Sequence, residues 1–364
     1  MTGGPMDEET VTGELLPATT PQADDHLPEI VDPSAVVLAA LDQAATNHLA
    51  KIRPKKTQSG YARDWALWQE FHDWTAERTG HRVADTDLTK GTMVAFVVWL
   101  DQVKQAAPNS IDRRITGVTV TARREHGVTV PKEATEAARA ALKPLKVDPE
   151  RIARGRGKAT AATPDQLRAM NTAVPTPAVG RKKHVPPEIA LLRDRTLAAM
   201  AFAIGGRVSE VSALAVDGIK LEGEGLEVFV PSVKGRPART VPVAFGDSAA
   251  TCPVRLWLTW REHLGRNTGP AFVPVNEVGV LGTQRLSPDG CRIAITRAAQ
   301  RAGLDARLTG HSMRRGFVTT ARKKGKKVEK IRAQTGHAIN SPVFWEYIDA
   351  GELWDDVATE GIGL

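Results

Sequence analysis

Cysteine, tyrosine and long apolar runs are all scarce in this chain of 364 residues. Its two cysteines, Cys252 and Cys291, lie far apart and form no C-x-x-C pair, which argues against a disulfide framework and a structural zinc site. The longest apolar run, 197–206, is about half as long as a membrane span, so we expect no segment that crosses a bilayer. The acidic N-terminus lacks the basic start of a secretory signal. These absences predict a protein of the reducing cytoplasm.

Basic residues are missing from positions 1–33 and abundant after them. The opening segment holds eight carboxylates and neither lysine nor arginine. Removing those eight from the 42 acidic residues leaves 34 against 49 lysines and arginines, so residues 34–364 carry a net charge of +15. The acidic segment is rich in Pro, Thr and Gly, and we expect it to be disordered. The basic body favours a polyanionic partner such as nucleic acid, although a soluble protein of high pI would share this charge.

Helical periodicity dominates residues 34–147. Ser34 is expected to cap a first helix, and Thr57 to open a second whose aromatic residues recur at three- and four-residue intervals. The first helix has an apolar face formed by Val37, Leu38, Leu41 and Ala45. Further helices are predicted over 93–103, 110–125 and 133–145. The pattern predicts a small all-helical domain.

Residues 148–162 show no apolar period and are predicted to link two domains. Four cations stand there among small residues, namely Arg151, Arg154, Arg156 and Lys158. A plain linker does not need them, which favours a basic strap that follows a DNA backbone.

The second domain is expected to fill residues 163–364, beginning with a capping Thr followed by Pro. A strongly apolar helix over 189–204 ends at a Gly-Gly pair, and strands over 226–231 and 240–243 form a hairpin with Lys234 at its turn. Helices follow over 253–265, 288–302, 312–325, 328–336 and around Tyr347. The predicted fold is mainly α with a small antiparallel β-sheet, in two domains.

The chain has only two tyrosines, and Tyr347 lies near its C-terminus, ten residues after His337. A tyrosine that merely filled space could as well have been Phe or Leu, so its hydroxyl is the feature to explain. Tyrosine can form a reversible covalent intermediate with a phosphoryl group. Because its free pKa is near ~10, it needs nearby cations and a base at neutral pH.

Other separated stretches supply those groups. Arg207 and Arg314 are candidates to clamp charged phosphoryl oxygens, because arginine offers paired donors and keeps its proton. His311, one helical turn before Arg314, can take or share a proton. His337 can hydrogen-bond the phosphate.

Two further residues complete the set. Lys234, at the tip of the hairpin, can protonate the leaving 5′ oxygen, and Glu210, one turn after Arg207, can orient a member of the site. Each member alone has an ordinary explanation as a surface charge or a core histidine, and it is the complete set that indicates phosphodiester transfer. A metal site on the histidines is disfavoured, because carboxylate or cysteine ligands at usable spacing are missing.

Basic residues that could contact DNA are spread over both predicted domains. Paired arginines on or beside the helix over 110–125 could form a solvated face, but the charge of the chain favours a surface that follows phosphates. The candidate DNA contacts are Lys55, Lys56, Arg113, Arg114, Arg123, Arg124, Arg154, Arg156, Lys158, Arg292 and Arg297.

The order R…K…H-x-x-R…H…Y resembles the tyrosine recombinase (phage integrase) family, and so do the surrounding residues. The matching text is G-x-R-x-x-E around Arg207, C-P-V-R-L-W at 252–257, H-S-M-R-R-G-F-x-T at 311–319, T-G-H-A at 335–338 and Y-I at 347–348. The resemblance spans roughly residues 35–364 and is far more specific in the second half.

This resemblance implies a SAM-like core-binding domain over 34–147 and a catalytic domain of the DNA breaking-rejoining type over 163–364. It implies cleavage of DNA through a 3′-phosphotyrosyl bond on Tyr347, attack by a free 5′-hydroxyl and a Holliday junction intermediate. No metal, ATP or other cofactor is implied. The chain is expected to act in the bacterial cytoplasm, associated with the nucleoid when bound.

The implied partners are double-stranded core sites, further copies of the chain in a synaptic tetramer, and an accessory DNA-bending or directionality factor. Leu353, Trp354 and Val357 share one face of the C-terminal tail. This face could be a local core lid, but tails in this family dock onto a neighbouring subunit, and we favour docking.

The sequence departs from the family pattern at two places. Ten residues separate His337 from Tyr347 where the family more commonly has nine, and Pro342 is expected to start the tyrosine helix one position late. Integrases that bind arm sites carry an extra DNA-binding domain before the core-binding domain. This chain has only the acidic residues 1–33 at that place, so we expect no arm-site binding. A related topoisomerase or telomere resolvase, and a non-cutting DNA-binding relative, are the alternative interpretations.

Overall fold

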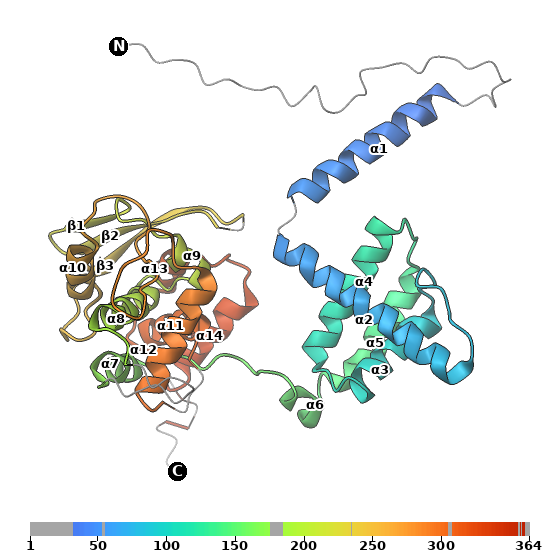
Figure 1. Ribbon diagram of the computed structural model, residues 1–364. Helices are drawn as coiled ribbons and strands as arrows, with labels where there is room; N and C mark the ends of the chain where they lie inside the picture. The colour runs from blue at the N-terminus through green and yellow to red at the C-terminus, as the bar shows by residue number, and fades with distance from the viewer. Residues whose placement is uncertain are drawn as a thin grey trace. The chain divides into compact units, whose positions relative to one another are not determined.

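A computed structural model of the chain describes residues 32–360, apart from 53–54, 175–184, 234, 305–307, 356 and 358. The chain divides into two compact units between Gly157 and Lys158, inside the predicted linker. Helices occupy both units, and the described strands lie in the second (Figure 1). The predicted fold class, mainly α with a small antiparallel sheet, is confirmed.

The first unit is built from helices alone in its described part. They are α1 (Pro33–Ile52), α2 (Lys55–Thr79), α3 (Lys90–Gln102), α4 (Pro108–Glu125), α5 (Lys132–Leu145) and α6 (Pro149–Ala153). Helices α2 to α5 enclose a core in which the rings of Trp68, Phe71 and Phe96 pack against one another. Fully burying one such phenylalanine stabilises the fold by about 1.5–3 kcal/mol, so this aromatic cluster is a main source of the stability of the unit.

Helix α1 differs from its prediction in its start. It begins at Pro33 rather than after a Ser34 cap, because the Asp32 carboxylate accepts a hydrogen bond from the Ser34 backbone N–H at 2.9 Å and so caps the first turn. Its apolar face is open among the described residues, since Leu38 is 60% exposed and Leu41 37%. Periodicity shows that a helix has an apolar side, but not what covers it.

The predicted linker is partly folded. The Asp148 carboxylate caps α6 by accepting backbone N–H groups of its first turn. Arg151 and Arg154 both donate to the buried Asp101 carboxylate, the latter at 2.7 Å. Leaving that carboxylate buried without partners would be costly, so these contacts hold the start of the linker on the first unit. The helix Pro149–Ala153 inside this linker was not predicted from the sequence.

The second unit combines helices with a three-stranded sheet. Its elements are α7 (Pro164–Thr172), α8 (Glu188–Ala203), α9 (Val208–Ala213), β1 (Ile219–Glu222), β2 (Gly225–Val230), β3 (Arg239–Ala244), α10 (Pro253–Leu264), α11 (Pro288–Arg301), α12 (Gly310–Lys323), α13 (Val328–Thr335) and α14 (Pro342–Glu352). The strands pair antiparallel in the order β1-β2-β3, with Leu226 opposite Val243. The sequence did not predict β1, because four residues are too few to display an alternating pattern.

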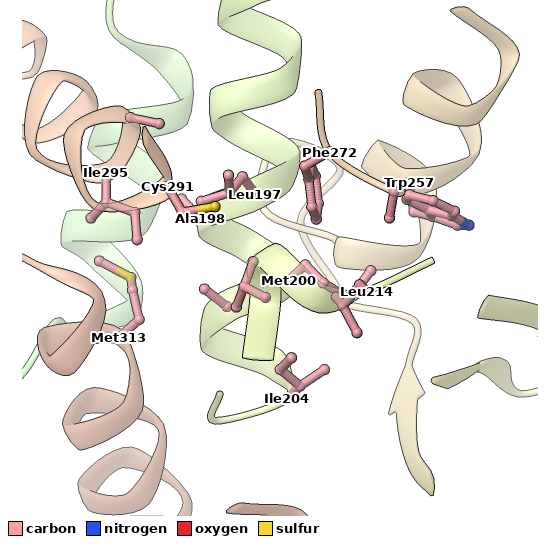
Figure 2. Close-up of a cluster of buried hydrophobic side chains, with 14 of the residues drawn as sticks. Leu197, Ala198, Met200, Ile204, Leu214, Trp257, Phe272, Cys291, Ile295 and Met313 are labelled. Carbon is pink, nitrogen blue, oxygen red and sulfur yellow. The ribbon is translucent and has the colours of Figure 1, made fainter. Parts of the chain in front are cut away.

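Helix α8 is apolar on nearly every side, as befits a helix in the middle of a domain. Its Leu197, Ala198 and Met200 lie in one cluster with side chains from the surrounding elements, among them Trp257 and Phe272 (Figure 2). The functional side chains described below stand on elements that pack around this core.

Both cysteines belong to this second core, where each is fully buried and free of any disulfide. The Cys252 sulfur accepts the Arg255 backbone N–H at 3.5 Å and caps α10. Burial raises the pKa of the Cys291 thiol to about 12. Across the described residues, no helix combines the length and apolar character needed to cross a membrane.

Candidate active site

Arg207 stands at the start of α9, directly after the Gly-Gly pair that ends α8. Gly205 has φ +54°, and a Cβ there would lie 2.6 Å from a methyl carbon of Thr335, so glycine alone permits this tight turn. The buried Glu210 carboxylate accepts the Arg207 backbone N–H at 3.0 Å and its Nη1 at 3.1 Å. The turn and the carboxylate together fix the direction of the Arg207 side chain.

The Glu210 carboxylate also lies at the centre of a group of arginines. Its Oε2 accepts a hydrogen bond from Arg239 Nη2 at 3.1 Å and lies 4.0 Å from Arg314 Nη1. Burial opposes the charge of this carboxylate, but hydrogen bonds from Arg239 and from the Arg207 backbone lower its pKa below the usual value. Glu210 is therefore ionised at neutral pH, and it contacts Arg207, one member of the predicted site.

Arg314 lies in α12 and is only 2% exposed. Its Nη1 donates to the carbonyl oxygens of Gly205 at 2.7 Å and Thr335 at 2.6 Å, while Nη2 is buried without a partner among the described residues. Burial, and then the nearby charge of Arg207, lowers the pKa of Arg314 to about 9. A buried donor left open beside a second guanidinium indicates a site that receives an anion.

His337 follows α13 through Gly336, whose φ of +63° is the left-handed conformation that ends many helices. The ring accepts a hydrogen bond at Nε2 from Arg314 Nε at 3.2 Å. Because a guanidinium can only donate, the ring proton must sit on Nδ1, which donates to Thr335 Oγ1 at 2.7 Å. Burial, followed by the charges of Arg314 and Arg207, lowers the pKa of His337 to about 2, so the ring is neutral.

This arrangement differs from the role predicted for His337. The sequence placed a hydrogen bond from its ring on the phosphate, whereas in the structure Nε2 already accepts from Arg314. The difference arises because the Nδ1 partner, Thr335, selects the tautomer, and that contact cannot be read from a motif.

His311 lies in the first turn of α12, one turn before Arg314. The His311 side chain is exposed. Partial burial, and the charges of Arg207 and Arg314, lower its pKa below the usual value. His311 is therefore unprotonated at neutral pH and can accept a proton.

Tyr347 lies on α14 and is half-buried. Its ring packs beside the apolar cluster formed by Val318, Ile331, Phe344 and Ile348. The ring centroid lies 6.3 Å from that of His337, edge to face, and the Arg315 Cζ lies 5.4 Å from it. Pro342 is the first residue of α14, as the sequence predicted. The structure thus brings Tyr347 and His337 of one chain together despite the ten-residue spacing.

The sequence model of the phage integrase family matches residues 162–351, more than half of the chain. The chain belongs to the phage integrase family. The predicted family is therefore confirmed. The match covers every catalytic candidate named above.

Individual members of the family agree with this assignment. An integrase/recombinase XerD homolog of Selenomonas ruminantium is 25% identical over 87% of this chain and 88% of its own length. The tyrosine recombinase XerC of Alcanivorax borkumensis is 31% identical over 40% of this chain and 45% of its own length. A lambda integrase structure, a dimer bound to a COC' core site, matches with a TM-score of 0.56 and 17% identity, covering 88% of this chain and 98% of that chain.

The phage integrase site contains residues that the sequence did not single out. Arg239, at the start of β3, contacts Glu210, and Arg236 Nη1 lies 3.4 Å from the Gly336 carbonyl oxygen. The run K-G-R-P-A-R around the hairpin turn was the available signal, but it does not show which cation faces the site. Lys234, the predicted acid of that turn, lies outside the described residues.

Several predicted DNA contacts of this integrase already have partners within the chain. Arg113 binds the buried Asp64 carboxylate with both terminal nitrogens, at 2.6 and 2.7 Å. Ionic contacts also hold Arg154, Lys158 and Arg292. Arg123 donates to the Val130 carbonyl oxygen. An arginine held by a buried carboxylate is less available to phosphate, so the prediction for Arg113 is weakened on this geometry.

The remaining predicted DNA contacts differ in how exposed their side chains are. Arg114 is half-buried, with Nε and Nη1 lacking partners among the described residues. The exposed members are Lys56, Arg124, Arg156 and Arg297. Lys55 opens α2, and its side chain lies outside the described residues. DNA contact by these side chains stays a prediction.

Proposed function

We propose that this chain is a site-specific DNA recombinase that cuts and rejoins DNA through a covalent bond between Tyr347 and a 3′ phosphate. The observation that carries the proposal is the open Nη2 of the buried Arg314, which lies beside Arg207 and is hydrogen-bonded to His337, whose ring centroid is 6.3 Å from that of Tyr347. A scissile phosphate offers the charged acceptor oxygens that this nitrogen lacks.

In the cutting step, the Tyr347 hydroxyl oxygen forms a bond to phosphorus, and the bond from phosphorus to the 5′ oxygen breaks. Arg207 and Arg314 stabilise the charge that develops on the phosphoryl oxygens. The phenolic proton goes to His311, which is exposed and is unprotonated at neutral pH. Lys234 supplies the proton that the leaving 5′ oxygen takes.

The rejoining step is the reverse reaction with a different strand. A free 5′-hydroxyl attacks the 3′-phosphotyrosyl bond, and Tyr347 leaves with a proton. One phosphodiester is exchanged for another through an ester of similar energy, so no external energy source is required. Two such exchanges, separated by a Holliday junction, complete recombination.

The proposed partners are double-stranded core sites and further copies of the chain, assembled as a tetramer in the bacterial cytoplasm and nucleoid. The C-terminal tail supports docking between copies, because Leu353 is 69% exposed and Trp354 76%. A lid over the local core would bury these side chains, so docking is favoured over the lid. An accessory DNA-bending or directionality factor remains part of the proposal.

A related topoisomerase or telomere resolvase would use the same chemistry, but the matched relatives carry integrase and recombinase names. A plasmid relaxation assay separates the two, since a topoisomerase relaxes any supercoiled plasmid. A non-cutting relative is disfavoured by the intact hydrogen bonds that join Arg207 to Glu210 and Arg314 to His337.

Covalent trapping tests the proposed nucleophile. Full-length protein is mixed with nicked DNA fragments from its own genomic neighbourhood, denatured and compared with Tyr347→Phe. We expect a protein–DNA adduct that requires Tyr347, because only its hydroxyl can form the ester. Tyr61→Phe, at the only other tyrosine, is the matched control and should form the adduct. An adduct that survives Tyr347→Phe would overturn the assignment, and binding without any adduct would favour the non-cutting alternative.

A further inference from the structure

Arg239 occupies a position that the roles above do not explain. It is the first residue of β3, and its side chain is only 14% exposed. Its Nη2 donates to Glu210 Oε2 at 3.1 Å, and its Nε donates to the Gln334 carbonyl oxygen at 2.9 Å. These acceptors belong to the two segments that carry Arg207 and His337. One side chain therefore joins both halves of the site.

A second set of contacts fixes the strand beneath this arginine. The Gln334 side-chain amide donates to the carbonyl oxygens of Pro242 at 2.9 Å and Ala203 at 3.0 Å. A Cβ at Gly336 would lie 3.1 Å from Arg239 Nη1, so the guanidinium packs closely against the turn that presents His337. The position of Arg239 is thus set by β3, α8 and the end of α13 together.

Arg239 also determines what Glu210 can bind. Glu210 Oε2 is occupied by Arg239 and by the Arg207 backbone, while Arg314 Nη1 remains 4.0 Å away. Among the described residues, the guanidinium groups of Arg207 and Arg239 donate hydrogen bonds to this ionised and buried carboxylate, so without Arg239 it would lose one of them. The nearest replacement is Arg314, and a direct ion pair would draw that guanidinium away from the carbonyl oxygens of Gly205 and Thr335.

We propose that Arg239 is a positioning residue for phosphoryl transfer: by occupying Glu210, it prevents this carboxylate from pairing with Arg314 and keeps Arg314 directed at the scissile phosphate. This inference rests on the proposed recombinase function. It assigns to Arg239 no contact with DNA.

The test measures adduct formation in single turnover at saturating protein, together with noncovalent affinity for the same nicked DNA. We expect Arg239→Gln to slow adduct formation by about a hundredfold, as misplacement of a reacting group by about 1 Å can, with less than about threefold change in affinity. Arg301→Gln is the matched control, because Arg301 is 13% exposed and binds the buried Asp194 carboxylate at 3.1 Å away from the site. It should cleave at the unaltered rate.

The double variant that combines Arg239→Gln with Glu210→Gln tests whether Arg239 acts through Glu210. If Arg239 acts by occupying Glu210, then Glu210→Gln removes the competing charge and should restore roughly tenfold of the rate lost in Arg239→Gln. A double variant that forms the adduct more slowly than Arg239→Gln would overturn the inference. An equal defect in Arg301→Gln would overturn it as well. Unaltered cleavage by Arg239→Gln would overturn it while leaving Tyr347 as nucleophile. Absence of any adduct from the unsubstituted protein would instead reject the recombinase function.

Discussion

Arg314 donates to two carbonyl oxygens and to His337, yet one terminal nitrogen stays buried and without a partner among the described residues. Such a nitrogen costs stability in the protein alone, because it has lost water and gained no acceptor. Its neighbours Arg207 and Arg239 add to that cost, as the lowered pKa of Arg314 reflects. The cost falls when a phosphate enters, so the site favours the charged phosphoryl group over the empty state.

The lowered pKa of His337 predicts a dependence of stability on pH. Its folded-state pKa of about 2 lies below the ordinary value of 6.5. The unfolded chain takes up a proton as pH falls through about 6.5 while the folded chain does not, so stability is lost progressively below that pH. At pH 5 this amounts to about 2 kcal/mol. We expect urea unfolding to show a pH-dependent loss that His337→Gln reduces by about this amount, because its amide can still accept from Arg314 but does not titrate, while the lowered pKa values of His311 and His72 keep their own contributions.

The control for this experiment is the same substitution at an exposed histidine. His263→Gln on α10 should leave the difference in stability between pH 7 and pH 5 as it is in the unsubstituted protein. An unaltered pH dependence in His337→Gln would show that the ring takes up its proton as readily in the folded chain as in the unfolded one.

The residues of the site could be predicted from sequence where a motif fixes both their type and their neighbours. Arg207 with Glu210 lies within one helical turn, so their contact follows from spacing. Arg239 could not be predicted in the same way, because its acceptor Gln334 lies 95 residues further along the chain. The tautomer of His337 was equally hidden, since it depends on Thr335 and Arg314 together.

At the scale of elements, the segment between Lys158 and α7 lies along α12. The Ala162 N–H donates to the Ser312 carbonyl oxygen at 3.0 Å, and Arg315 Nη1 donates to Ala159 O at 3.0 Å. Gly316 permits this contact, because a Cβ there would lie 2.0 Å from the Ala162 carbonyl oxygen. The end of the predicted linker is therefore part of the second unit.

Gly316→Ala is expected to dislodge that segment. The added methyl group overpacks the contact with Ala162, which should destabilise the protein by about 1–3 kcal/mol. Trypsin should cut after Lys158 faster than in the unsubstituted protein, which can be measured by limited proteolysis. Gly223→Ala is the control, because nothing lies within 4 Å of a Cβ at that position. Equal cutting of both variants would show that the helix surface at Gly316 does not hold the segment.

The elements that could be predicted are those whose own sequence shows both an apolar periodicity and a residue that marks the end of the element. Helix α7 is an example, because Thr163 caps it and Gln166 completes the capping box. Helix α6 was missed because ion pairs to Asp101, and not an apolar face, hold it in place. Helix α1 shows the opposite case: its apolar period is clear, but among the described residues no core covers that face.

At the scale of the whole molecule, the exposed C-terminal tail predicts that a substitution there weakens assembly but leaves the stability of the folded chain nearly unchanged. Trp354 is 76% exposed, so Trp354→Ala should change the free energy of unfolding by no more than about 0.5 kcal/mol. The same change should weaken the proposed tetramer on core-site DNA, because the proposed docking surface loses its largest apolar side chain. Sedimentation of the protein–DNA complex measures this. Phe229→Ala, which removes a 48% exposed ring from β2, should leave assembly intact.

Loss of assembly in the Phe229→Ala control would show that the effect is not specific to the C-terminal tail. Intact assembly in Trp354→Ala would return the tail to the local-lid interpretation.

The burial of both native thiols makes the chain well suited to fluorescence labelling. Cys252 and Cys291 are each 0% exposed, and the Cys291 thiol, whose pKa burial raises to about 12, presents almost no reactive thiolate at neutral pH. One cysteine introduced on the surface of each unit would therefore react with maleimide dyes while the native pair stays silent. A donor and an acceptor placed in this way would report how the distance between the units changes when DNA is added, without first replacing any residue of the core.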